Sequence, residues 1–300
     1  MIRDAENRHM PVMLKAAVEL LNPQPGAVIV DGTVGLAGHS LAIVERLGNT
    51  GRLIAIDQDA AALKIAAERL TAFAERCLFA QGNFSRLKEL LAGLCIASVD
   101  GILLDIGVSS LQLDDYARGF NVRQEGPLEM RMDPSQGQTA SDLVNRLSER
   151  EIEQIIREYG EERHSRRIAR AIVQQRERQP IITTRELSLL ILRCVGPRGR
   201  QDRIHPATRT FQALRIAVNR ELEVLTEGLA QGYAVLRPQG RFVVIGFHSL
   251  EDRIVKNTFR AWGDNGMARA LTKKPLRPSP EEIENNHRSR SARLRAVERI

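Results

Sequence analysis

The hydrophobic and polar positions alternate in a regular way over the first third of the chain. Between residues 10 and 105, short apolar runs bounded by turn residues alternate with stretches whose apolar positions recur every three or four residues. This pattern is typical of βα units around a parallel sheet. We expect strands at residues 27–31, 52–57, 77–80 and 99–105, with helices near residues 39–47, 59–73 and 84–93. The pattern predicts a doubly wound α/β fold of the kind that binds nucleotides.

The pattern changes after Asp105. Residues 107–137 carry scattered glycines and prolines without periodicity, which favours a functional loop over a simple connection. Helical periodicity follows at residues 141–146, 148–159, 161–178 and 184–195, and Ser148 with Glu151 matches a capping box. A long helix from Pro206, a strand at 241–247 and a helix opening at Ser249, with Ser249 and Asp252 as a second capping box, restore the α/β pattern. The chain therefore predicts one α/β domain, residues 1–112 and 209–300, interrupted by an all-helical insertion at 113–208.

A glycine-rich loop after the first strand predicts a cofactor site. Gly32, Gly35 and Gly38 lie where the backbone must turn tightly before a helix. Asp57 ends the second strand 22 residues after Gly35, where a carboxylate can accept hydrogen bonds from ribose hydroxyls. The loop lacks the Gly-x-Gly spacing for a pyrophosphate, and Asp31 would repel a phosphate. A cationic cofactor fits better, which favours methyl transfer from S-adenosylmethionine, with Asp31 facing its positive end, over a nicotinamide-dependent oxidoreductase.

Composition excludes several classes of protein. With 43% hydrophobic and 27% charged residues and only short apolar runs, the chain is not expected to span a membrane. Residues 1–10 show no secretory signal, and three widely spaced cysteines do not form a disulfide framework, so we expect a cytoplasmic protein. The six histidines have no metal-ligand spacing, and no catalytic metal is expected. The capping box at Ser249 disfavours a serine hydrolase.

The charge of the chain is compatible with a nucleic acid partner. The formal net charge is +7, and residues 269–300 alone hold nine basic and four acidic residues. Arginine outnumbers lysine by 38 to 6, and its planar guanidinium suits phosphates and base edges. A GC-rich genome would produce the same bias, and a basic surface alone does not define a site.

Several motifs together resemble one family, the bacterial small-subunit ribosomal RNA cytosine-N(4) methyltransferases of the RsmH/MraW type. The similar blocks follow one another over nearly the whole chain: residues 9–12, the glycine-rich loop, 100–110, 112–115, 118–120, 127–134, 160–163, 205–215, 247–253 and 288–290. The resemblance implies a class I (Rossmann-like) S-adenosylmethionine-dependent methyltransferase sheet, with the helical insertion between its fourth and fifth strands. It implies methylation of the exocyclic N(4) of a decoding-centre cytidine in 16S rRNA.

The resemblance also assigns cofactor residues. Ala37, Gly38 and His39 match the segment that contacts S-adenosylmethionine, in addition to Asp31 and Gly35 from the loop itself. By the same resemblance, Asp57 matches the ribose acid, Phe84 the residue flanking the adenine, and Asp105 and Gln112 the contacts near the methionine end and the target pocket. The chain departs from the family at Leu36 and Ala37, where glycine is usual, and at His164 and His287.

The chemistry requires a hydrogen-bond or proton acceptor near the amine. The exocyclic amine of cytosine is a poor nucleophile because its lone pair is delocalised, so the enzyme must orient it and accept its proton. We expect Asp105, at the end of the fourth strand, to be an acceptor for the amine or the cofactor. Asp114 and Asp115 are rival candidates for the base. The alternative for Asp105 is a structural cap on the following turn.

Candidate RNA contacts come from three segments. They are Arg118, Phe120 and Arg131 in the long loop, Arg209 and Arg215 on the helix from Pro206, and Arg288 and Arg290 in a basic C-terminal tail. The alternative is structural, with Phe120 packed in a core and the arginines solvated. The expected partner is 16S rRNA within a small ribosomal subunit or late assembly intermediate, without a membrane, and a homodimer is compatible with the resemblance. A different hypothesis is a non-catalytic RNA-binding ribosome-assembly factor with a nucleotide-binding fold.

Overall fold

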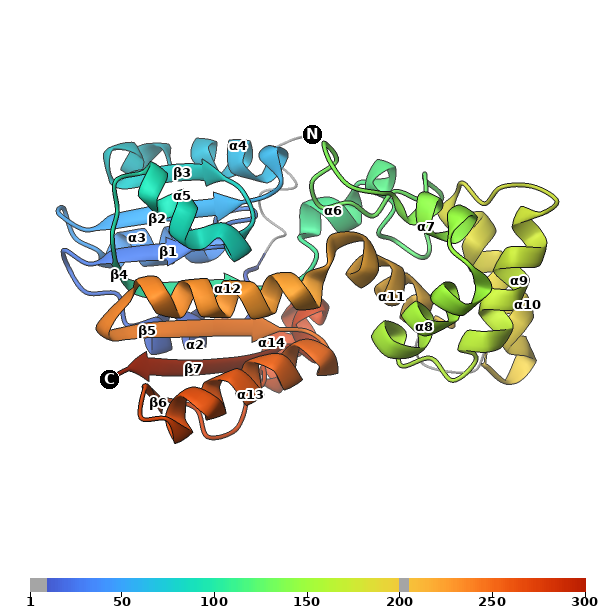
Figure 1. Cartoon of the computed structure of the whole chain (residues 1–300). Coiled ribbons are helices and arrows are strands. Elements are labelled where there is room, and N and C mark those ends of the chain that lie inside the picture. The colour runs from blue at the N-terminus through green and yellow to red at the C-terminus, as the bar shows by residue number, and fades with distance from the viewer. Residues whose placement is uncertain (1–9, 200–204) are drawn as a thin grey trace. The chain divides into compact units, whose positions relative to one another are not determined.

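Seven strands form one sheet in the order β3-β2-β1-β4-β5-β7-β6 (Figure 1). The computed structural model describes residues 10–199 and 205–300, so His9 of the first resembling block lies outside it. The strands are β1 Val28–Asp31, β2 Arg52–Asp57, β3 Cys77–Gln81, β4 Val99–Asp105, β5 Leu236–Gly246, β6 Ala268–Ala270 and β7 Arg293–Arg299. Strands β1 to β5 pair in parallel, whereas β7 runs antiparallel to both β5 and β6. The predicted Rossmann-like α/β sheet is confirmed.

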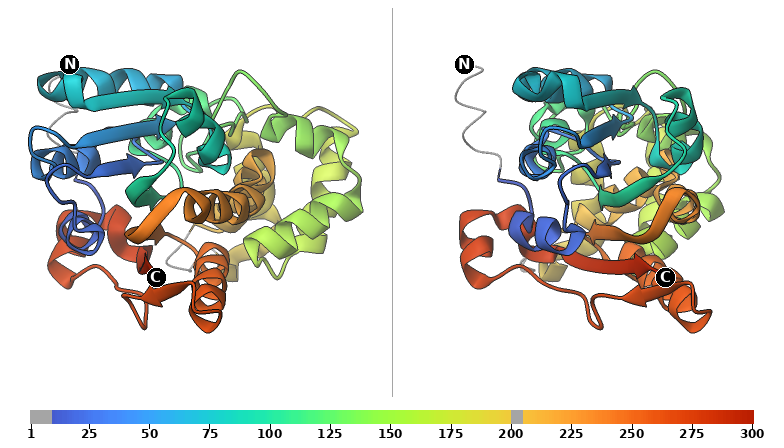
Figure 2. Two further views of the ribbon diagram at one scale, coloured as in Figure 1. Left: turned by 60° about the vertical axis from the view of Figure 1, so that its left-hand side comes forward. Right: turned by 90° about the vertical axis from the view of Figure 1, so that its left-hand side faces the viewer.

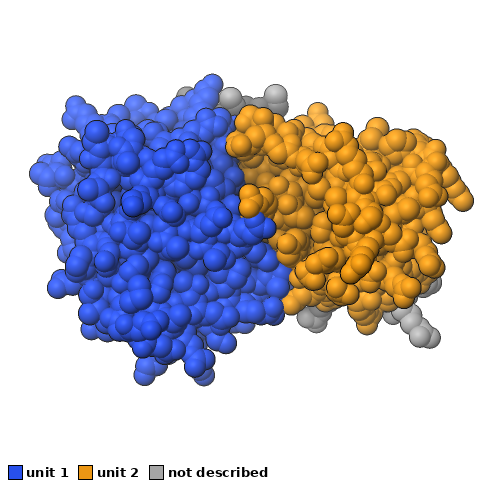
Figure 3. All heavy atoms as spheres, viewed as in Figure 1, with its two compact units in different colours: residues 1–107, 222–300 blue, residues 108–221 orange. Residues whose placement is uncertain are grey.

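The chain divides into two compact units, which Figure 3 colours separately. The sheet unit comprises residues 1–107 and 222–300, and the helical unit comprises residues 108–221. The helices that accompany the sheet are α2 Leu14–Leu21, α3 Gly38–Arg46, α4 Ala60–Arg69, α5 Leu87–Gly93, α12 Glu221–Val235, α13 Ser249–Asp264 and α14 Pro280–Asn285. Short 3-10 turns complete this unit: η1 Thr71–Arg76, η2 Phe84–Arg86 and η4 His287–Ser291.

Both faces of the sheet are covered by helices (Figure 2). Successive side chains of a strand point to opposite faces, so Ile29 packs with α2, α3 and α4, while its neighbour Val30 packs with α5, α12 and α13. In β4, Leu103 belongs to the first cluster and Leu104 to the second. Burial on two faces explains why these strands read as nearly continuous apolar runs.

The helical unit has a core of its own. It contains α6 Ser110–Asp114, η3 Tyr116–Arg118, α7 Ala140–Arg146, α8 Glu149–Gly160, α9 Ser165–Arg176, α10 Thr184–Gly199 and α11 Thr208–Asn219. The capping box of Ser148 and Glu151 at the start of α8 is confirmed. Asn219 holds the loop that precedes α7, because its amide donates to the carbonyl of Met130 and accepts from the N–H of Met132, each at 2.8 Å.

The boundaries of the helical unit differ from the predicted insertion at 113–208. Helix α11 belongs to this unit because Phe211 and Leu214 are buried in its core. The helix expected from Pro206 is two helices, α11 and α12, separated at Arg220, which adopts a left-handed conformation with φ of 49°.

Two further expectations for the C-terminal third are wrong. The basic tail is partly a strand, because residues 293–299 form β7 inside the sheet, where Arg293 and Arg295 pair with Asp252. The capping box of α13 consists of His248 and Glu251, not Ser249 and Asp252. Among the described residues, no helix combines the length and apolarity needed to cross a membrane.

Candidate cofactor and catalytic site

Three aspartates end neighbouring strands of the sheet. Asp31 is the last residue of β1, Asp57 of β2 and Asp105 of β4, and β1 pairs in parallel with both other strands. Their side chains therefore belong to the same carboxyl edge, the part of an open α/β sheet where ligands bind.

Asp57 fixes the glycine-rich loop. Its Oδ2 accepts the N–H of Gly35 at 2.9 Å, and its Oδ1 accepts the N–H of Asp59 at 2.9 Å. Gly35 has φ of 49°, which favours glycine. Burial raises the pKa of Asp57 to about 6, although both hydrogen bonds oppose this shift. Each oxygen keeps a second lone pair, so the carboxylate can also accept hydroxyl donors.

Asp31 is buried beneath the same loop, with 1% of its surface exposed. Its Oδ2 accepts the hydroxyl of Ser40 at 2.7 Å, and its Oδ1 accepts the N–H of Thr33 at 3.2 Å. Burial raises its pKa to about 6, against the lowering effect of these bonds. Asp31 thus joins β1 to the loop and to α3, and its charge acts from beneath the loop.

Asp105 carries a buried oxygen without a hydrogen-bond partner among the described residues, its Oδ1. Its backbone N–H donates to Oγ1 of Thr33 at 2.7 Å, which ties the end of β4 to the loop. Burial, followed by the charges of Asp31 and Glu251, raises the pKa of Asp105 well above its usual value. A carboxyl group with this pKa has a high affinity for a proton.

His39 lies between Asp105 and the N-terminal segment. Its Nε2 is 3.0 Å from the carbonyl oxygen of Val12, and its Nδ1 is 3.8 Å from Oδ2 of Asp105. Because a carbonyl only accepts, Nε2 of His39 carries a proton in this contact, and Nδ1 faces the carboxyl group of Asp105. The predicted cofactor residue His39 therefore also positions the segment before α2.

Ala37 holds a left-handed backbone conformation, which favours glycine, although it carries a side chain. Ala37 adopts φ of 60° and is fully buried in the core of the sheet unit, where its methyl group packs among apolar residues. The adjacent Gly38 has no room for a side chain, because an added Cβ would lie 2.3 Å from Cγ of Pro11. The segment of Pro11 and Val12 is thus packed directly on the start of α3.

Phe84 follows β3 and packs on α12. A Cβ added at Gly228 would lie 2.3 Å from Cδ2 of its ring, so the glycine makes room for the phenylalanine. The preceding Asn83 donates from its side chain to Oε1 of Gln58 at 3.0 Å, and the N–H of Gly82 donates to the carbonyl of Asp57 at 2.9 Å. The Phe84 segment is therefore fastened to the end of β2.

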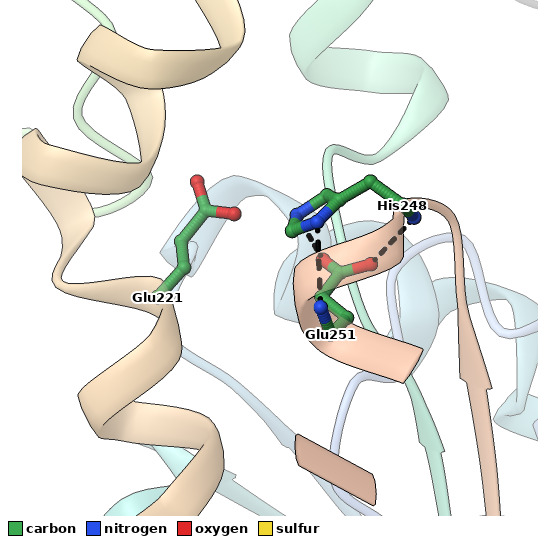
Figure 4. A group of neighbouring side chains, drawn as sticks. All are labelled: Glu221, His248 and Glu251. Carbon is green, nitrogen blue, oxygen red and sulfur yellow. Dashed lines mark hydrogen bonds and ion pairs between the residues drawn. The ribbon is translucent and has the colours of Figure 1, made fainter. Parts of the chain in front are cut away.

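Glu251 is a further residue of this edge that was not among the predicted site residues. It is buried, with 2% exposed, and its Oε1 lies 3.0 Å from Nε2 of His248 (Figure 4). Its Oε2 accepts the N–H groups of Phe247 at 2.7 Å and His248 at 3.1 Å. The sequence does contain an indication of this pair, because Glu251 stands three residues after His248, which follows the strand predicted at 241–247.

Three predicted site residues belong to the helical unit. Oε1 of Gln112 accepts the N–H of Ser109 at 3.1 Å, completing a capping box at α6. Asp114 is exposed at the end of α6, and Oδ1 of Asp115 accepts the N–H of Ala117 at 2.9 Å. Asp115 therefore has a local capping function in this unit.

The loop residues expected to bind RNA are largely structural. Phe120 is 8% exposed and packs in the core of the helical unit, so its ring is not available for base stacking in this conformation. Arg118 donates to the carbonyls of Arg131 at 3.1 Å and Met132 at 2.9 Å. Arg131 pairs with Glu129 and reaches the carbonyl of Gln136 at 3.5 Å. These contacts hold the loop together.

The remaining candidate arginines differ in exposure. Arg215 makes a bidentate pair with Glu221, with both distances 2.8 Å, which accounts for its half-buried guanidinium. Arg209 is exposed and donates to the carbonyl of Glu161 at 3.4 Å. Arg288 and Arg290 are exposed on η4. Arg209, Arg288 and Arg290 are exposed enough to contact phosphates, whereas Arg215 is not.

The comparison with known proteins decides the family. Residues 6–300 match the model of the MraW methylase family. The chain belongs to the MraW methylase family. Among its relatives named ribosomal RNA small subunit methyltransferase H, that of Syntrophotalea carbinolica is 50% identical, with 98% of each chain covered. That of Trichlorobacter lovleyi is 48% identical and that of Carboxydothermus hydrogenoformans 46%, each covering 98% of this chain and 99% of the relative.

Family membership confirms the predicted methyltransferase and its cofactor, S-adenosylmethionine. The residues of this MraW site fit that cofactor. Residues 31–39 contain no lysine or arginine that would match a phosphate, while three carboxylates end the strands around them. The unpartnered Oδ1 of Asp105 offers a buried acceptor at the same edge.

Proposed function

We propose that the chain transfers a methyl group from S-adenosylmethionine to the exocyclic N(4) of a decoding-centre cytidine in 16S rRNA. The relatives named for small-subunit rRNA methylation support the substrate, since they cover nearly the whole chain at about half identity. The motifs that resemble cytosine-N(4) methyltransferases support the base and the position. The substrate is the rRNA of a small ribosomal subunit or late assembly intermediate in the cytoplasm, and the enzyme acts as a monomer or a homodimer.

The sheet unit supplies the residues that would hold the cofactor. Asp57 accepts the ribose hydroxyls, because its oxygens are already oriented by Gly35 and Asp59. The backbone of Gly35, Ala37, Gly38 and His39 would contact the methionine end, and Phe84 would flank the adenine. Gln112, in the helical unit, is a further candidate only by the family resemblance. The charge of Asp31 favours a cation above the loop. Bound S-adenosylmethionine supplies an electrophilic methyl group.

Asp105 is the residue we assign to the amine. The observation that carries this assignment is its buried Oδ1, which has no hydrogen-bond partner among the described residues. This oxygen accepts a hydrogen of the exocyclic amine and so directs the nitrogen lone pair toward the methyl group. Methyl transfer to this nitrogen would require the nitrogen to lose a proton. The raised pKa of Asp105 suits it to receive that proton, with Asp114 and Asp115 as the rival acceptors.

The test uses small subunits that lack their native rRNA modifications. The protein is incubated with labelled S-adenosylmethionine and these subunits, and the digested rRNA is analysed by mass spectrometry. N(4)-methylcytidine at the decoding centre is the expected product. Label on another nucleoside overturns the assigned target, and tight RNA binding without label favours the non-catalytic assembly factor.

A further inference from the structure

A basic groove of about 680 Å³ lies on the sheet unit, lined by residues other than those assigned to the cofactor and the amine. It is lined by α13, by the segment from residue 270 to 277 and by β7. Seven lysines and arginines line it, against only two acidic residues, Asp252 and Asp264. None of the residues proposed above for methyl transfer belongs to its lining, so this charge has no function in the mechanism already described.

Two arginines of β7 and one aspartate of α13 lie together in this groove. Nε of Arg295 lies 2.7 Å from Oδ1 of Asp252, and Nη1 of Arg293 lies 3.3 Å from Oδ2. Burial alone would raise the pKa of Asp252, but the bonds and charges of Arg295 and Arg293 hold it below its usual value. The carboxyl group therefore stays ionised at neutral pH, and the three side chains together keep one positive charge in excess.

Exposed lysines add to this charge. Lys256 projects from α13, and Lys273 and Lys274 from the segment that follows β6. Three of the six lysines of the chain thus line one groove, although arginine is the prevalent basic residue elsewhere. Arg277 is exposed on the same segment, whereas Arg260 is paired with Asp264 at 3.5 Å.

The backbone that carries the two adjacent lysines is held at both ends. On one side, the N–H of Leu271 donates to the carbonyl of Ala296 at 3.0 Å, and Oγ1 of Thr272 accepts the N–H of Ala296 at 3.0 Å. On the other side, the N–H of Leu276 donates to the carbonyl of Leu294 at 2.9 Å. Lys273 and Lys274 therefore stand on a short arch whose ends are fixed to β7, so binding need not order this backbone first.

We propose that this groove binds the phosphodiester backbone of an RNA strand. The proposal rests on the proposed function, because that function makes an RNA the substrate. The main support for RNA binding in the groove is charge complementarity, because an excess of basic side chains in an open groove suits a polyanion. Phe259 is the only aromatic residue of the lining and is buried, which leaves no ring for a base to stack on. The groove therefore positions the RNA without reading its sequence.

The test compares two double variants that remove the same charge. Lys273→Ala/Lys274→Ala alters the groove, and Lys64→Ala/Lys88→Ala, at exposed positions of α4 and α5, is the matched control. Binding of a fluorescent single-stranded RNA is measured by anisotropy over a range of salt concentrations. Losing two phosphate contacts lowers the salt slope by about 1.4 and weakens binding about tenfold near physiological salt. The control keeps both values, and S-adenosylmethionine affinity by calorimetry stays unchanged in both variants.

Three results overturn the proposal. They are unchanged RNA binding in the groove variant, an equal loss in both double variants, and binding of fluorescent polyglutamate by a wild type that does not bind the RNA. The last result would indicate an acidic protein partner. Methylation of small subunits by the wild type distinguishes failure of the groove proposal from failure of the proposed methyltransferase function. If the groove variant binds RNA normally while the wild type still forms N(4)-methylcytidine, only the groove is refuted. If the groove variant loses RNA binding while the wild type forms no N(4)-methylcytidine, only the proposed function is refuted.

Discussion

Gly35 donates its backbone N–H to Oδ2 of Asp57 at 2.9 Å, across 22 residues of sequence. The glycine-rich loop and the acid at the end of β2, which the sequence presents as separate motifs, are therefore one hydrogen-bonded structure. A change at Asp57 removes the proposed ligand for the ribose and also removes the acceptor that holds the glycine-rich loop.

We expect Asp57→Ala to weaken S-adenosylmethionine binding at least tenfold, as measured by calorimetry. The substitution leaves the N–H groups of Gly35 and Asp59 without their acceptor, which costs about 1–3 kcal/mol for each group that stays buried. Asp57→Asn keeps an oxygen acceptor and is expected to lose less stability. Normal cofactor affinity in Asp57→Ala would refute the assignment to the ribose.

Asp105→Asn is expected to reduce methyl transfer by about a hundredfold to ten-thousandfold, because the amide cannot accept the proton. The variant should fold at least as stably as the wild type, since it removes the cost of ionising a buried group. Single-turnover methylation and S-adenosylmethionine affinity are measured together. Retained turnover in Asp105→Asn, with loss in Asp114→Asn or Asp115→Asn, would move the base to one of these residues.

The free energy of unfolding should depend on pH through Asp31. Its pKa is raised from 3.8 to about 6 in the folded protein, so the fold favours the protonated form. The stabilisation is complete below pH 3.8 and is lost as the pH rises through 6, amounting to about 3 kcal/mol by pH 7. Urea unfolding of the wild type and Asp31→Asn is compared from pH 4 to 7. The advantage of the wild type should shrink over this range, and parallel profiles would contradict the prediction.

Gly228→Ala should displace Phe84, because the new Cβ would stand 2.3 Å from its ring. We expect a loss of about 1–3 kcal/mol in unfolding free energy and weaker binding of S-adenosylmethionine. Gly93→Ala in α5 is the control, because a Cβ there meets nothing within 4 Å. If Gly228→Ala loses stability but keeps full cofactor affinity, Phe84 is a packing residue and does not flank the adenine.

Arg215 and Arg209 should differ although both lie on α11. Arg215→Ala leaves Glu221 half-buried without its bidentate partner, and a loss of about 2 kcal/mol or more is expected. Arg209→Ala, at an exposed position, should change stability by less than about 0.5 kcal/mol. It should still weaken binding to small subunits. Thermal unfolding and subunit binding are measured for both variants, and equal effects on stability would contradict the distinction.

The sequence could predict the first four strands because each is a mainly apolar run bounded by turn residues. Strands β1, β2 and β4 are largely buried, whereas the edge strand β3 is only partly buried. It could not predict β7, because Arg293 and Arg295 in a strand resemble a solvated basic segment until their partner Asp252 is known. Asp31, Asp57 and Asp105 could be placed because parallel strands end at one edge. The contact of His39 with the carbonyl of Val12 depends on tertiary packing, so no local sequence pattern predicts it.

The antiparallel strand β7 has a consequence for how the molecule forms during synthesis. Among the described strands, β6 pairs only with β7. Strand β7 lies between β6 and β5, although β6 precedes β7 in the chain. Until residues 293–299 leave the ribosome, β5 therefore presents an open hydrogen-bonding edge, which is a template for pairing with other nascent chains. Strand β6 is therefore made before β7 but can join the sheet only after it.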